Sequence, residues 1–173
     1  TLIEAPTGSG KTEAALAYAW RLLESRTVDS AIFALPTQAT ANAMLARAED
    51  FAAKAFAGDA ANIVLAHGKR WFHPGFKQLL AAGQQPAAQG KQEATRQCAT
   101  WLAQSRKRVF LGQVGICTVD QVLLSVLPVR HQFVRGFGIN KSVLIVDEVH
   151  AYDRYMHGLL AEVLRRQKAA GGN

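Results

Sequence analysis

Cysteine is scarce in this sequence, and long hydrophobic runs are missing from it. Only Cys98 and Cys117 occur among the 173 residues, and they do not stand at a paired spacing. This excludes a disulfide framework and a cysteine-rich zinc site, and it favours a reducing compartment such as the cytoplasm. No apolar stretch approaches the roughly 18–20 residues that a membrane span requires, and the first residues do not form a signal peptide. We therefore expect a cytoplasmic domain with no membrane partner.

Acidic residues are scarce in the middle of the chain. Residues 64–141 contain eleven lysines and arginines but only Glu93 and Asp120. Because the neutralisation of phosphates releases counterions, so basic a segment favours a polyanionic partner. A solvated basic surface that only improves solubility explains the same composition equally well.

The order of the apolar segments indicates an α/β fold. Short apolar runs alternate with longer helical patterns, which is typical of βαβ units around a parallel sheet flanked by helices. Strands are predicted at Leu2–Ala5, Ala31–Leu35, Ile63–Ala66, Val114–Thr118 and Ser142–Asp147. Helices are predicted at Lys11–Glu24, Ala39–Ala57, Lys91–Arg106, Val119–Leu127 and Arg154–Ala169, with Trp20 and Trp101 in the core. The run Val109–Gly112 fits either a further strand or the end of a helix.

The length indicates one domain over residues 1–173. Glycine and proline break up the pattern from residue 68 onward, so we expect an insertion at about 68–108. A core strand is predicted from the second residue, and the last residues follow a helix directly. We therefore expect the chain to be a piece of a longer protein.

A glycine-rich segment follows the first predicted strand. Ala5–Thr12 reads APTGSGKT and leads directly into a predicted helix, which is the context that a phosphate-binding loop requires. Gly8 and Gly10 can adopt positive φ and turn backbone N–H groups toward an anion, and the helix adds the positive end of its dipole. Lys11 would reach the β- and γ-phosphates, and the Thr12 hydroxyl would bind Mg²⁺. The residues expected to bind ATP are Thr7, Gly8, Ser9, Gly10, Lys11 and Thr12.

Two adjacent carboxylates follow the last predicted strand. Val143–Val146 is apolar enough to be buried on both faces, and Asp147 and Glu148 come directly after it. Ligands of parallel α/β sheets bind at the carboxyl ends of strands, so these carboxylates are expected beside the phosphate loop. We predict that Asp147 holds Mg²⁺ and that Glu148 orients and deprotonates the attacking water. With Lys11, they would be the catalytic residues of an ATP hydrolase.

The loop and the acidic pair together resemble the motifs of superfamily 2 helicases and translocases. The first loop position is Ala5 instead of glycine, which resembles the A-x-x-G-x-G-K-T variant of helicases. The segments Gly112–Gln121, Gln132–Gly138 and Asp147–Asp153 look like the helicase portion of the type I CRISPR-associated helicase–nuclease. The similarity covers nearly the whole chain and is weaker over residues 68–108.

This resemblance implies a RecA-like P-loop NTPase domain, the first of two motor domains in a larger enzyme. It also implies a nuclease domain ahead of the motor, recruitment by an RNA-guided CRISPR surveillance complex, and degradation of the displaced DNA strand. The sequence contains no His-Asp dipeptide for a nuclease centre, no Ser-Ala-Thr motif, and no second motor domain with its arginine finger. The chain alone is therefore expected to bind nucleotide weakly and to hydrolyse it slowly or not at all.

The resemblance further implies contacts with single-stranded DNA. The residues matched to DNA-facing motifs are Pro36, Thr37, Gln38 and Asn42 in one segment, and Thr118 and Asp120 in another. His150 would couple the nucleotide state to the rest of the motor. Helix capping by Thr37 or Asp120 is the structural alternative to DNA contact. An RNA helicase, or a nucleotide- and DNA-binding module without turnover, also fits the motor motifs.

Residues 67–77 carry two weaker signals. His67 and His73 lack the spacing and the further ligands of a metal site, so we expect them to be solvated. Lys69–Lys77 interleaves cations with aromatic residues, which suits either the stacking of single-stranded bases or packing of the insertion onto the core.

Overall fold

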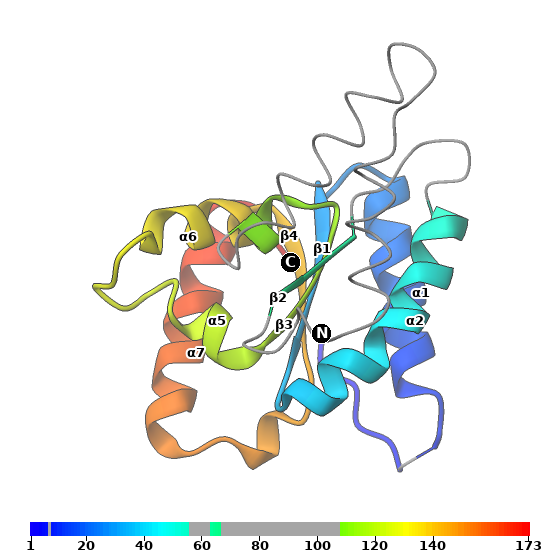
Figure 1. Ribbon diagram of the computed structural model, residues 1–173, viewed down its shortest axis with the longest axis horizontal. Coiled ribbons are helices and arrows are strands. Elements are labelled where there is room, and N and C mark those ends of the chain that lie inside the picture. The colour runs from blue at the N-terminus through cyan, green and yellow to red at the C-terminus, as the bar shows by residue number, and fades with distance from the viewer. Residues whose placement is uncertain (7, 56–62, 67–107) are drawn as a thin grey trace, which may run out of the picture.

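The chain folds around a parallel four-stranded sheet with helices on both of its faces (Figure 1). The computed structural model describes residues 1–6, 8–55, 63–66 and 108–173. Its elements are α1 (Lys11–Glu24), β1 (Ser30–Leu35), α2 (Gln38–Ala55), β2 (Ile63–Ala66), η2 (Arg108–Leu111), β3 (Val114–Thr118), α5 (Val119–Leu123), α6 (Gln132–Asn140), β4 (Ser142–Val146), η3 (Val149–Ala151) and α7 (Arg154–Ala169). The predicted α/β class with a flanked parallel sheet is confirmed.

The strands lie in the order β2-β3-β1-β4, so β1 pairs with both β3 and β4. Leu35 stands opposite Thr118, and Ala34 stands opposite Val146. Three strands therefore end at one edge of the sheet, and the segments that follow them emerge there together.

Side chains of β1 alternate between two hydrophobic layers. Ala31, Phe33 and Leu35 pack with α1 and α2, whereas Ile32 and Ala34 pack with residues of α5, α6 and α7. All six residues of β1 are buried, as expected of a central strand in a parallel sheet. Hydrophobic side chains thus pack on both faces of the sheet, and this packing fixes the position of its carboxyl edge, from which the following segments leave.

Helix α1 returns the chain from this edge to the start of β1. Its 14 residues span about 21 Å, and the six residues of β1 span about 20 Å. Because α1 runs antiparallel to β1, its first turn lies at the edge where β1 ends. Figure 1 shows the start of α1 and the turn after β4 at the same lower edge of the molecule.

Two predictions made for the first twenty residues, a strand at Leu2–Ala5 and a buried Trp20, are wrong. Leu2–Ala5 forms no strand, and Leu2 and Ile3 are 79% and 40% exposed. An apolar run becomes a strand only where a partner edge is open, and the outer edge of β4 is bonded at Leu144 and Ser142 by the backbone of Asn173. Trp20 is 45% exposed because it lies at the rim of the stripe through which Leu16 and Ala19 face the core.

The region between β3 and β4 also differs from the predictions. Helix α6 was not predicted, because Gly136 and Gly138 reduce its helix propensity. Helix α5 ends at Leu123 instead of Leu127. The run Val109–Gly112, for which a strand and the end of a helix were both open, falls largely in the 3₁₀ helix Arg108–Leu111 and not in a strand. The predicted helix Lys91–Arg106, Trp101 and the signals between residues 67 and 77 lie outside the described residues.

Gly138 is packed against the backbone, whereas Gly136 on the same helix is not. A Cβ added at Gly138 would collide with the carbonyl group of Phe110, which is 1% exposed. A Cβ added at Gly136 would meet nothing within 4 Å.

These two glycines therefore predict substitutions of opposite sign. Gly138→Ala should lower the free energy of unfolding by about 1–3 kcal/mol, since η2 must move. Gly136→Ala should raise it by about 0.5–1 kcal/mol, since it only restricts the unfolded chain. Equilibrium denaturation of both variants measures this, and a loss of stability of similar size in both would contradict the packing of α6 on η2.

Candidate functional site

The glycine-rich loop has the backbone that the sequence predicts. Gly8 and Gly10 adopt φ of 79° and 85°, and Gly10 is the N-cap of α1. Ser9 closes the turn, because its backbone N–H and its hydroxyl both donate to the carbonyl of Pro6, at 3.3 and 2.6 Å. Space around Gly8 is open, so glycine is needed there for its φ and not for its size. Thr7 lies outside the described residues.

Lys11 reaches back over the loop. Its Nζ donates to the carbonyl oxygens of Ala5 and Pro6, at 2.6 and 3.1 Å. The side chain is partly exposed, as is that of Thr12 beside it. A partly solvated ammonium, the free N–H groups at the start of a 14-residue helix and glycines at positive φ form a set of donors that suits a phosphate chain.

The acidic turn after β4 is fixed through its backbone. The N–H of Asp147 donates to the carbonyl of Ala34 on β1 at 3.0 Å, which extends the ladder by one bond. The N–H of Glu148 donates to Oδ1 of Asp147 at 3.1 Å. Glu148 has φ of 53°, a left-handed conformation that costs a residue with a Cβ roughly 1–2 kcal/mol. The two carboxylates are partly exposed or exposed, so a cation or water can reach them.

His150 contacts the acidic pair directly. Its Nε2 lies 3.2 Å from Oε2 of Glu148, and both side chains are largely exposed. Sequence analysis predicted a coupling role through bonds beyond the site, whereas the observed contact is within the site, with Glu148 itself. The coupling role stays a prediction.

Tyr152 is a residue of this site that sequence analysis missed. Its hydroxyl donates to the carbonyl of Asp147 at 2.8 Å, and the residue is 8% exposed. Burial, followed by the nearby carboxylates of Asp147 and Asp120, raises the pKa of Tyr152 to about 12. The hydroxyl therefore remains a hydrogen-bond donor at neutral pH. The only sequence signal was an aromatic residue five positions after Asp147.

The residues proposed to face DNA divide into two groups. Thr37 and Gln38 are exposed and Pro36 and Asn42 partly so, at the start of α2. Thr37 also caps this helix, since its Oγ1 accepts from the backbone N–H of Thr40 at 3.2 Å. Helix capping, the alternative to DNA contact, is thus observed for Thr37, although its exposed side chain is still accessible to a nucleic acid.

In the second segment, Thr118 is 7% exposed and Asp120 is exposed. The burial of Thr118 leaves little of its side chain accessible, and its contact with DNA stays a prediction. Asp120 does not cap α5 either, since the N-cap position is occupied by Thr118.

The start of α2 and the acidic turn emerge at the carboxyl edge of the sheet, and the start of α1, which follows the phosphate loop, lies at the same edge (Figure 1). Among the described residues no group of three His, Cys, Asp or Glu side chains could hold a metal ion. Mg²⁺ does not need such a cage, because it is commonly held by one or two carboxylates together with substrate phosphates. Thr12 and Asp147 fit that sparse donor set.

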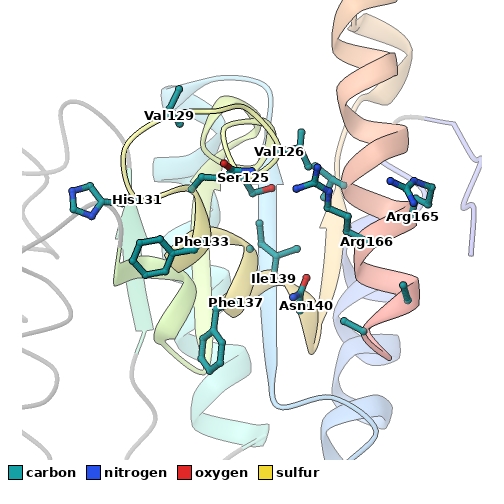
Figure 2. Close-up of a pocket in the computed structure, with 15 residues that line it drawn as sticks. Ser125, Val126, Val129, His131, Phe133, Phe137, Ile139, Asn140, Arg165 and Arg166 are labelled. Carbon is teal, nitrogen blue, oxygen red and sulfur yellow. The ribbon is translucent and has the colours of Figure 1, made fainter.

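A groove of about 810 Å³ lies near the opposite edge of the sheet, between α6 and α7 (Figure 2). Phe133 and Phe137 are 77% and 75% exposed there, and none of the described residues that line the groove is acidic. Arg165 and Arg166 lie on its other side, and both donate to the carboxylate of Glu162. The groove is therefore separate from the loop and the acidic turn. No helix in the described part of the chain is long and apolar enough to cross a membrane.

Comparison with known proteins agrees with this geometry. The model of the DEAD/DEAH box helicase family matches residues 1–170. The chain is 59% identical to the CRISPR-associated endonuclease/helicase Cas3 of Escherichia coli strain K12 over 173 residues, which are all of this chain and 19% of that protein. It is 40% identical to the Cas3 of Thermus thermophilus, over 99% of this chain and 19% of that protein.

Solved structures give the same result. The crystal structure of T. fusca Cas3-ATP superposes with a TM-score of 0.79 at 34% identity, over 98% of this chain and 18% of that one. The crystal structure of T. fusca Cas3-ADP superposes with a TM-score of 0.77 at 33% identity, again over 98% of this chain and 18% of that one. The chain thus spans about one fifth of the relatives that it matches. The resemblance to the CRISPR-associated helicase–nuclease and the RecA-like fold are confirmed, and the chain belongs to the DEAD/DEAH box helicase family.

Proposed function

We propose that this chain is the ATP-binding motor domain of an ATP-dependent, single-stranded-DNA helicase or translocase that carries a nuclease and acts in CRISPR antiviral interference. The observation that carries the proposal is that the start of α1, where Lys11 lies, and the Asp147–Glu148 turn are found at one edge of the sheet (Figure 1). The names of the relatives support the same function, since they are CRISPR-associated helicases and nucleases. Three of the similar crystal structures contain ATP, ADP or AMPPNP according to their descriptions.

In this proposal each side chain at the edge has one task. Lys11 exchanges the carbonyls of Ala5 and Pro6 for phosphate oxygens, while the N–H groups of the loop and of the first turn of α1 bind the remaining oxygens. Thr12 and Asp147 hold Mg²⁺, which offsets the charge of the phosphates. Glu148 orients the attacking water and takes its proton. His150 holds the Glu148 carboxylate through its contact with Oε2.

Single-stranded DNA is proposed to contact the neighbouring segments at the same edge. Pro36, Thr37, Gln38, Asn42 and Asp120 are at least partly exposed there. Backbone N–H groups and hydroxyls suit phosphate contacts, which position a strand without reading its bases. Equal affinity for DNA and RNA oligonucleotides in a fluorescence anisotropy titration would favour the RNA helicase alternative.

The remaining partners are proposed to be a second RecA-like domain, a nuclease domain and an RNA-guided surveillance complex. They would lie in the four fifths of the relatives that this chain does not span. Because hydrolysis in this class needs a transition-state arginine from the second motor domain, the chain alone should bind nucleotide weakly and turn it over slowly. Phosphate release that stays low after a second domain is added would favour a binding module without turnover.

Removal of the Lys11 ammonium tests the nucleotide site. Lys11→Ala should abolish stabilisation by Mg-ATP and leave the fold intact, because the side chain is partly exposed and its ammonium donates to carbonyls of the loop and not to the core. At about 100 times the dissociation constant, ATP should stabilise the unsubstituted chain by about 2.7 kcal/mol. Thermal unfolding with and without Mg-ATP measures both effects. Lys168→Ala, on the exposed face of α7, is the matched control and should respond as the unsubstituted chain does.

Glu148→Gln separates binding from hydrolysis. The amide keeps a hydrogen-bond acceptor near His150 but cannot take a proton from water. ATP affinity of this chain should therefore be unchanged, while ATP hydrolysis by the longer protein should fall by about 10²–10⁴-fold. Phosphate release by the longer protein at saturating DNA measures this, with Glu24→Gln as a control. An unchanged rate of ATP hydrolysis in Glu148→Gln would show that Glu148 is not the general base.

A further inference from the structure

The peptide group between Asp147 and Glu148 has both of its polar atoms engaged. Its carbonyl oxygen, which belongs to Asp147, accepts from the hydroxyl of Tyr152 at 2.8 Å. Its N–H, which belongs to Glu148, donates to Oδ1 of Asp147 at 3.1 Å. This peptide joins the two residues whose carboxylates are proposed to bind Mg²⁺ and activate water. Its orientation therefore sets the direction in which both carboxylates point.

Tyr152 is itself anchored away from the site. Its ring packs in a buried cluster with Val119 and Leu123 of α5 and with Leu160 of α7. The residue is 8% exposed, and it follows the single turn of η3 directly. A ring held by two helices has little freedom, so its hydroxyl presents a fixed donor to the acidic turn.

A fixed donor is useful here because the turn adopts an unfavourable conformation. Glu148 has φ of 53°, which residues with a Cβ adopt only where the surroundings hold them. From the side of β4, the bond from the Asp147 N–H to the Ala34 carbonyl holds the start of the turn. The Tyr152 hydroxyl adds the constraint from the other side, on the carbonyl that precedes the strained residue.

We propose that Tyr152 is a positioning residue: by holding the carbonyl of Asp147, its hydroxyl fixes the Asp147 carboxylate in the position that binds the metal ion of the metal–nucleotide complex, and keeps the Glu148 carboxylate beside it. This inference rests on the proposed function, because it assumes that the edge binds ATP with Mg²⁺. It assigns Tyr152 no contact with nucleotide, water or metal.

Tyr152→Phe is the variant that tests this role, since it keeps the ring in its cluster and removes only the hydroxyl. The loss of one hydrogen bond should raise the Mg²⁺ concentration for half-maximal ATP binding by about three- to tenfold. Affinity for ATP in the presence of EDTA should stay unchanged, because Lys11 and the loop supply it. Titration of Mn²⁺ into the ATP-bound chain, followed by electron paramagnetic resonance, gives a second readout that depends on metal binding alone.

Two controls distinguish positioning from a general effect on stability. Leu160→Val changes the same buried cluster without touching the acidic turn, so it should lower the melting temperature and leave the metal dependence unchanged. Tyr155→Phe removes a hydroxyl from an exposed tyrosine of α7 and should change neither quantity. A shift in metal dependence as large in Leu160→Val as in Tyr152→Phe would overturn the proposal.

Failure of this inference is separable from failure of the proposed function. If the unsubstituted chain shows no ATP binding that depends on Lys11, the nucleotide site itself is refuted, and the positioning role with it. If ATP binds through Lys11 but Tyr152→Phe has the metal dependence of the unsubstituted chain, only the role of Tyr152 is refuted.

Discussion

The parallel pairing of β1 with both β3 and β4 determines where the start of α2, the start of α5 and the acidic turn emerge. Its register places Leu35 beside Thr118 and Ala34 beside Val146, so three strands end within one residue of each other. The next bond of the ladder, from Asp147 to Ala34, extends that order into the acidic turn. A slip of one residue in this register would exchange the two faces of β1 and move the carboxylates away from the edge.

Burial on both faces makes that register difficult to change. Phe33 packs with α1 and α2, and Ile32 packs with the helices of the other face, so each alternate side chain of β1 has a different set of partners. A slip would place every one of them in the wrong layer. The hydrophobic core thus supports function by fixing the position of the functional segments, although none of its residues contacts a ligand in the proposed mechanism.

Sequence patterns were sufficient for the features that local chemistry fixes. The positive φ of Gly8 and Gly10, the bounds of α1 and α7, and the acidic pair after an apolar strand follow from glycine, helix periodicity and apolar runs, although Leu144, Ile145 and Val146 of that strand are only partly buried. These features depend on neighbours within a few residues, so a single sequence carries the information for them.

The features that sequence reasoning missed depend on tertiary partners. Whether Leu2–Ala5 forms a strand depends on an open sheet edge, and whether Gly138 is tolerated in α6 depends on the backbone of Phe110. The role of Tyr152 needs the distance from its hydroxyl to the carbonyl of Asp147, which no spacing rule gives. The burial of Thr118 is of the same kind, since a threonine at the end of a strand can face either the core or the surface.

The two halves of the site are held in different ways, and this difference bears on how it would work. The acidic half is tied to the sheet by Asp147 and to the helical core by Tyr152, so its backbone is fixed before any ligand arrives. The described bonds of the cationic half lie within its own loop, from Lys11 to the carbonyls of Ala5 and Pro6 and from Ser9 to the carbonyl of Pro6. The bonds from Lys11 can be exchanged for bonds to phosphate oxygens at little cost, because an ionised acceptor then replaces a neutral carbonyl. Adjustment on binding should therefore be concentrated in the loop and in the Lys11 side chain. A metal site needs fixed ligands more than a flexible ammonium does, which is consistent with the core of the domain supporting the carboxylates and not the lysine.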